Sequence, residues 1–128
     1  MSAMSDYLEN AVLDHVLRNT AYTAPTTVYV ALFTTSPGES GSGTEVSGGA
    51  YVRKAVTFGA AASGQISNSL DLEFDQATAS WGTVSHIGIM DASTAGNLLF
   101  HGALAVSKAI DSGDIFRIVT GELTVSLD

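Results

Sequence analysis

Two apolar runs joined by a short polar turn, in residues 79–106, constrain the fold of this chain more than any other feature. The runs are rich in Val, Ile, Phe and Trp, which suit the pleated, half-buried surface of a β-strand. Between them, Gly96 and Asn97 tolerate the positive φ that a chain reversal needs. The stretch therefore predicts a β-hairpin. Because both faces of each run are apolar, we expect the hairpin to lie at the centre of a two-layer structure and not at an exposed edge.

Five further stretches have the apolar or alternating character of β-strands. They are residues 27–34, 51–58, 70–75, 115–119 and 123–127. With the hairpin they give about seven strands, at the spacing typical of a sandwich or barrel. We therefore predict a mainly β fold: an antiparallel β-sandwich or β-barrel-like domain with one N-terminal amphipathic helix. We expect residues 1–128 to form a single β-rich domain, long enough to bury a core although the chain has no Cys.

Two of these stretches predict which side chains share one side of a strand. In residues 51–58, Val52, Val56 and Phe58 share one side of the expected strand, and in residues 70–75 we expect Leu70, Leu72 and Phe74 to point inward. In residues 70–75 they alternate with three carboxylates, Asp71, Glu73 and Asp75. We interpret these as a solvated acidic face rather than a calcium site, because strand spacing alone does not wrap oxygens around an ion.

The first twenty residues contain the predicted helix, over residues 5–18. Its apolar stripe consists of Leu8, Val12 and Val16 at four-residue spacing, with Leu13 and Leu17 alongside. Asp6 and Glu9 resemble a capping box, and Asp14 stands four residues before Arg18, a favourable ion-pair spacing. We expect the stripe to cover either the sheet of this domain or a neighbouring subunit.

Residues 36–49 predict a long, flexible Gly/Ser surface loop, since these fourteen residues include five glycines and one aliphatic side chain. Loops of this length are usually functional or mobile. We therefore hypothesise a partner interface formed by the helix, the loop and the residues next to it. Its candidate residues are Leu8, Val12, Val16, Pro37, Glu45, Val46 and Tyr51.

Composition argues against several classes of function. Thirteen acidic residues against five basic ones give a net charge of −8, which disfavours binding to nucleic acid or to an anionic membrane surface. The chain has no long apolar run and no signal peptide pattern. Its three histidines show no metal-ligand or catalytic spacing, and we interpret them as structural. No catalytic motif is present, so we predict no enzyme, no cofactor and no metal site.

Several segments together resemble a family of small proteins of tailed bacteriophages, commonly labelled phage tail fibre proteins. The segments that carry the resemblance are residues 29–33, 43–58, 81–89, 96–99 and 102–104. The resemblance spans nearly the whole chain and implies a structural component of the virion. It brings no catalytic residues with it.

Within that class, the sequence favours a capsid decoration (cement) protein that bridges capsid subunits on the exterior of the virion after synthesis in the host cytoplasm. The chain has no heptad, collagen-like or shaft repeat, and it has few charged residues. The expected partners are the major capsid protein or other virion structural proteins, and a homotrimer is the favoured oligomer. The alternatives are a tail-associated fibre or baseplate adaptor, and a carbohydrate-binding module using Tyr51, Trp81 or the loop.

Overall fold

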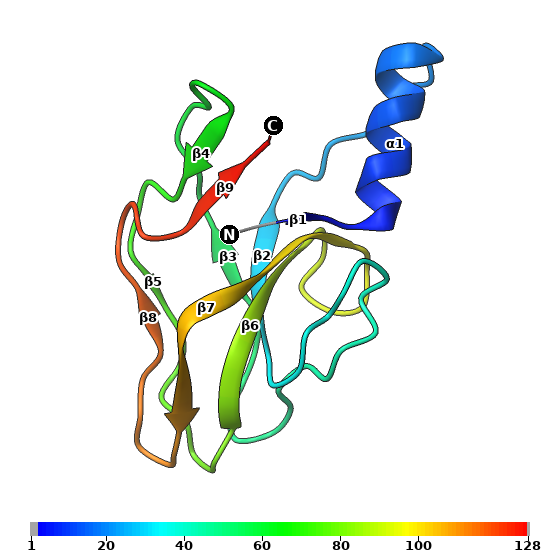
Figure 1. Ribbon diagram of the computed structural model, residues 1–128. Coiled ribbons are helices and arrows are strands. Elements are labelled where there is room, and N and C mark those ends of the chain that lie inside the picture. The colour runs from blue at the N-terminus through cyan, green and yellow to red at the C-terminus, as the bar shows by residue number, and fades with distance from the viewer. Residues whose placement is uncertain (1–2, 128) are drawn as a thin grey trace.

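The structure, a computed structural model, describes residues 3–127. It is mainly antiparallel β with one helix near the N-terminus, which confirms the predicted fold class (Figure 1). In chain order the elements are β1 (Ala3–Met4), α1 (Asp6–Leu17), β2 (Val28–Phe33), β3 (Lys54–Val56), β4 (Gln65–Ser67), β5 (Leu72–Glu73), β6 (Gly82–Met90), β7 (Leu98–Ile110), β8 (Arg117–Ile118) and β9 (Thr124–Ser126). No helix within residues 3–127 is long and apolar enough to cross a membrane.

The largest sheet has five strands in the order β1-β7-β6-β2-β3, and every neighbouring pair is antiparallel. The predicted hairpin is confirmed as β6 and β7, and β7 continues beyond the predicted end to Ile110. Strand β6 lies in the middle of the sheet, and β2 lies beside it. Within residues 3–127 this sheet stays open, with β1 and β3 at its two ends.

Two short ladders, β4–β9 and β5–β8, lie beside the large sheet (Figure 1). The main hydrophobic core joins the two parts in a sandwich-like arrangement. It combines buried side chains of the large sheet, such as Val30, Leu32, Val56 and Val84, with those of the ladders and their flanks, such as Leu72, Phe74, Phe116 and Leu123. Trp81 lies in the same cluster, and its ring contacts those of Tyr51 and Phe74.

Asn68 is a buried polar residue that holds the turns beside the ladders together. Its Nδ2 donates to the carbonyls of Leu70 and Val119 at 2.8 and 3.1 Å. Its Oδ1 accepts from the backbone N–H groups of Gly121 and Leu123, both at 3.0 Å. Four hydrogen bonds satisfy the whole amide, so its burial does not leave a polar atom without a partner.

The pairing of β6 with β7 contains a large irregularity. Val84 pairs with Lys108, while His86 pairs with Ala103. Four residues of β7, numbers 104–107, therefore stand opposite Ser85 alone. Extra residues in one strand bend it and leave part of its backbone unpaired, and Figure 1 shows β7 turning sharply along its length.

The second face of the large sheet carries a smaller cluster of Ala31, Phe33, Met90 and Leu98. It explains why β2 carries apolar side chains on both of its faces. The start of α1 attaches next to this cluster, since the hydroxyl of Ser5 donates to the carbonyl of Leu98. The β2–β6–β7 sheet thus has a hydrophobic cluster on each of its two faces.

Some local predictions were wrong. Leu70 does not face the core: it is 63% exposed, because the regular strand there covers only Leu72–Glu73. Val52 is 51% exposed while Val56 is buried, since the neighbouring strand covers only Lys54–Val56. Two additional strands, β1 and β4, are too short to show a pattern in the sequence. The helix cap is Ser5 and not Asp6, since the Ser5 hydroxyl accepts from the Leu8 N–H at 3.2 Å.

Candidate functional site

Helix α1 carries an unpartnered apolar surface. The predicted ion pair of Asp14 and Arg18 forms, with an N–O distance of 3.1 Å, and Leu8 packs into the protein. Leu13, Val16 and Leu17, however, are 56%, 68% and 74% exposed. We call these three residues the apolar helix face. Figure 1 shows α1 projecting beyond the strands, so only the start of the helix is anchored.

The candidate interface residues fall into different environments. Leu8, Pro37 and Val46 are buried by the chain's own atoms, so their side chains have little area to offer a partner. Val12, Glu45 and Tyr51 are half-buried, and Val16 is exposed. Glu45 and Tyr51 belong to one hydrogen-bonded network, whereas the helical residues do not. The interface itself stays a prediction.

The network centres on the Glu45 carboxylate, and we call it the Tyr51 network. The Tyr51 hydroxyl donates to Glu45 Oε2 at 2.6 Å, and Arg53 forms a bidentate pair with the same carboxylate at 2.9 Å. Burial alone would raise the pKa of Glu45, but the hydrogen bonds from Arg53 and Tyr51 outweigh it and hold the pKa below its ordinary value. Burial, together with the hydrogen bond to Glu45, raises the pKa of the Tyr51 hydroxyl well above its ordinary range.

The same hydroxyl also completes the edge of β2. Strand β3 pairs with β2 only as far as Val30, so no residue of β3 pairs with the backbone N–H and carbonyl of Leu32. The Leu32 N–H donates to the Tyr51 hydroxyl at 3.0 Å, and the Leu32 carbonyl accepts from the Val46 N–H at 2.9 Å. A side chain and a loop residue thus take the place of a neighbouring strand.

Arg53 extends the network to the turn of the central hairpin. Its Nη1 donates to the carbonyls of Ala92 and Ala95 at 2.9 and 2.8 Å. One guanidinium therefore ties the end of the 36–49 segment to the β6–β7 turn. The sequence showed an Arg and a Glu eight residues apart, but nothing local indicated that they meet.

An apolar groove runs between β7 and the segment that contains β8 and β9. Its volume is about 570 Å³. Apolar lining residues include Ile89, Phe100, Leu104, Val106, Val119 and Leu123, while Lys108, Arg117 and Glu122 supply charge. We call this cavity the β7 groove. Residues 104–106 of the irregular stretch line it, and Val106 is 71% exposed there.

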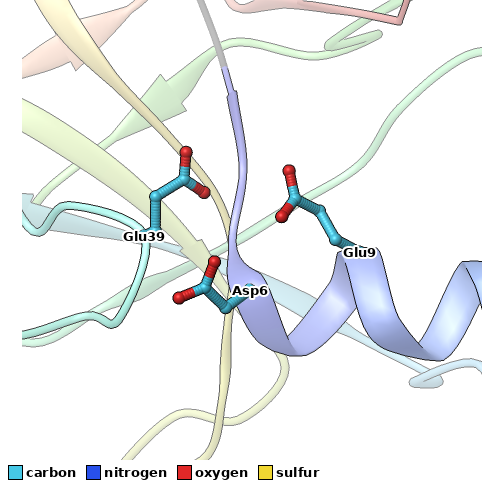
Figure 2. Close-up of side chains that lie close together, drawn as sticks. All are labelled: Asp6, Glu9 and Glu39. Atoms are coloured by element: carbon cyan, nitrogen blue, oxygen red, sulfur yellow. The ribbon is translucent and has the colours of Figure 1, made fainter.

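Three carboxylates, those of Asp6, Glu9 and Glu39, approach one another where α1 begins (Figure 2). One oxygen from each lies within 4.8 Å of the others, and all three residues are exposed. The positive end of the helix dipole favours negative charge at this position. Exposure to solvent and the helix dipole therefore explain how three carboxylates can lie this close together.

The acidic face of residues 70–75 is more connected than the sequence suggested. Asp71 accepts hydrogen bonds from the backbone and side chain of Thr120, and these bonds lower its pKa. Glu73 pairs with Arg117 at 2.7 Å, and Asp75 pairs with Lys54 at 2.8 Å. Each carboxylate thus has its own separate partner, and the three do not converge on one point.

The histidines lie in three different settings. Nδ1 of His15 is 3.1 Å from the Thr20 carbonyl, and Nδ1 of His86 is 2.8 Å from the Ser85 hydroxyl. Nε2 of His101 is buried without a hydrogen bond, 4.0 Å from a Glu39 oxygen. These positions give no shared geometry for acid–base chemistry within residues 3–127.

The fold and these surfaces define a small antiparallel β protein with an apolar helix face and an open apolar groove, the kind of surface through which proteins contact one another. The chain matches, over residues 3–126, the model of the Gp80 family, described as Podophage GP4 fiber I protein gp80. It therefore belongs to this family of phage fibre proteins and is a structural component of a bacteriophage virion. No curated protein matches the chain.

Proposed function

We propose that the protein is a non-enzymatic subunit of a tail-associated fibre on the exterior of the phage particle. The observation that carries the proposal is the family match, which extends over residues 3–126 and whose description names a fibre protein. This description favours the tail-associated alternative over a capsid decoration protein. Another structural protein of the virion is the expected partner.

The surfaces of the chain support an assembly role. The apolar helix face and the β7 groove are open to a partner, and large exposed apolar patches commonly mark protein–protein contacts. The Tyr51 network fixes the loops at one end of the sheet without using an exposed charge pair. A subunit of this kind adds a compact β body to an assembly, and any extended shaft is supplied by other chains.

Quantitative mass spectrometry of separated heads and tails from the source virion tests the proposal. We expect the chain in the tail fraction, at a small number of copies relative to the major capsid protein. Hundreds of copies in the head fraction would overturn the fibre assignment in favour of capsid decoration.

A glycan array of the purified chain addresses the carbohydrate-binding alternative. The side chain of Trp81 is buried and its Nε1 donates to the Gly49 carbonyl at 2.8 Å, so the ring is occupied in packing. We expect no glycan to bind. Specific binding that the Tyr51→Phe variant loses would instead indicate a receptor-binding role.

A further inference from the structure

The protein carries two apolar surfaces that lack a partner, one convex and one concave. The apolar helix face consists of Leu13, Val16 and Leu17, which follow the i, i+3, i+4 spacing of side chains that share one side of a helix. Helices that dock in grooves of other proteins use anchors with this spacing. The concave surface is the β7 groove.

The groove is suited to receive side chains rather than a whole helix. Its volume of about 570 Å³ lies in the range of clefts that hold a small organic ligand. The irregular pairing of β7 opens one wall, and Val106 stands 71% exposed there. Three aliphatic side chains match both the size and the polarity of this space.

The two surfaces do not meet within one copy of the chain. Leu13, Val16 and Leu17 are all more than half exposed, so none of them fills the groove of its own molecule. Figure 1 shows why: α1 stands apart at one side of the view, whereas β8 and β9 lie toward the other. A helix from a second molecule has no such restriction.

The charged residues beside the two surfaces allow one favourable pair. Glu9 lies one helical turn before Leu13 on the same side of α1, and it belongs to a cluster of three exposed carboxylates. Lys108 and Glu122 both line the groove, and neither forms an ion pair within residues 3–127. In the orientation that brings Glu9 toward Lys108, the ammonium group would lower the repulsion among the carboxylates.

We propose that the apolar helix face of one copy docks in the β7 groove of a second copy. The contact is heterologous, since the two molecules use different surfaces, so each copy has one helix to give and one groove to fill. Such a contact generates a closed ring or an open chain, depending on the rotation between neighbours. The inference goes beyond the fibre assignment, which concerns only the place of the protein in the virion.

The absence of native Cys makes disulfide trapping a direct test. Two full-length variants, Val16→Cys and Val106→Cys, each place one thiol at an exposed position. Far-UV circular dichroism establishes that both fold. Under mild oxidation we expect a disulfide-linked dimer when the two variants are mixed, and only background dimer from either variant alone.

The other outcomes each contradict the proposal. Dimers of Val16→Cys alone, formed as readily as in the mixture, would show that helices pack against helices. Dimers of Val106→Cys alone would show that the β7 edges of two copies pair with each other. No disulfide in the mixture, with both variants folded, would mean that the two surfaces do not meet.

Sedimentation velocity of the purified full chain provides a second measurement. We expect self-association of the wild type and its loss in the double variant Leu13→Ser/Leu17→Ser. Val52→Ser is the matched control, because it removes an exposed apolar side chain outside both surfaces and is expected to associate normally. A wild type that remains monomeric would overturn the proposal, while the tail location measured by mass spectrometry would be unaffected.

Discussion

Replacement of Tyr51 by Phe tests whether one hydroxyl completes the edge of β2. The substitution keeps the aromatic ring, which stacks near Phe74 at 6.2 Å and meets Trp81 edge-on at 5.5 Å. It removes only the oxygen that donates to Glu45 and accepts from the Leu32 N–H. The variant therefore separates the hydrogen bonds from the packing.

Two losses determine the size of the effect. The hydrogen bond to an ionised carboxylate contributes about 1.5–3 kcal/mol, and a buried N–H left without an acceptor costs about 1–3 kcal/mol. Leu32 is fully buried, so water does not readily replace the missing acceptor. The two effects overlap, and the hydroxyl no longer has to be desolvated, so we expect a net loss of about 2–3 kcal/mol in the free energy of unfolding. For a chain of this length that loss lowers Tm by roughly 6–15 °C.

Urea unfolding, followed by far-UV circular dichroism and by the fluorescence of the single Trp, measures the difference at matched protein concentration. Tyr7→Phe is the control, because Tyr7 is 42% exposed on α1 and is expected to change stability by less than about 0.5 kcal/mol. If Tyr51→Phe unfolded within about 0.5 kcal/mol of the wild type with an unchanged m value, the hydroxyl would not support the β2 edge as argued.

Three further predictions concern other contacts of the fold. The folded-state pKa of Glu45 is lowered, so the ionised carboxylate stabilises the fold above its ordinary pKa of 4.5, and this stability is lost as the pH falls through the folded-state pKa. Glu45→Gln is therefore expected to flatten the acid side of a plot of Tm against pH. An unchanged acid side would contradict this. Asn68→Ala removes the partners of four backbone groups and is expected to cost about 2–4 kcal/mol in urea unfolding, whereas a cost under about 1 kcal/mol would show that water replaces the amide. Gly43→Ala would place a Cβ 2.5 Å from the Ser36 carbonyl oxygen, and we expect it to lower the free energy of unfolding by about 1–3 kcal/mol. The control variant Ser42→Ala, at an exposed neighbouring position, is expected to change it very little. Equal Tm values for the two variants would refute the clash.

The elements that the sequence predicted well are those with a local pattern. Helix α1 and the β6–β7 hairpin have spacing and turn residues that operate over a few positions, and both formed close to their predicted bounds. Strands β1 and β4, with two and three residues, are defined by hydrogen bonds to distant segments. No local pattern distinguishes such strands from a loop.

The candidate site was harder to predict than the fold. The helix was correctly expected to be amphipathic, but its sequence did not show which apolar residues pack inward: Leu8 does, and Val16 does not. The hydrogen bond between the Tyr51 hydroxyl and the Leu32 N–H joins residues nineteen positions apart. A contact at that separation leaves no repeating pattern in the sequence. The β7 groove depends on a bulge whose size is set by the pairing of whole strands.

The way in which Tyr51 completes β2 also has a consequence for the edge of the sheet when other extended chains come close. An unpaired strand edge offers a repeating row of donors and acceptors, which any extended chain can join, including another copy in the wrong register. The Tyr51 phenol offers one hydroxyl, which already accepts from the Leu32 N–H and donates to Glu45. The next groups on this side of β2 bind the 44–46 segment of the same chain, since the Val46 N–H donates to the Leu32 carbonyl and the Thr34 N–H donates to the Thr44 carbonyl, both at 2.9 Å. The backbone donors and acceptors of Leu32 and Thr34 on this side are therefore used within the chain, and another extended chain does not find them free.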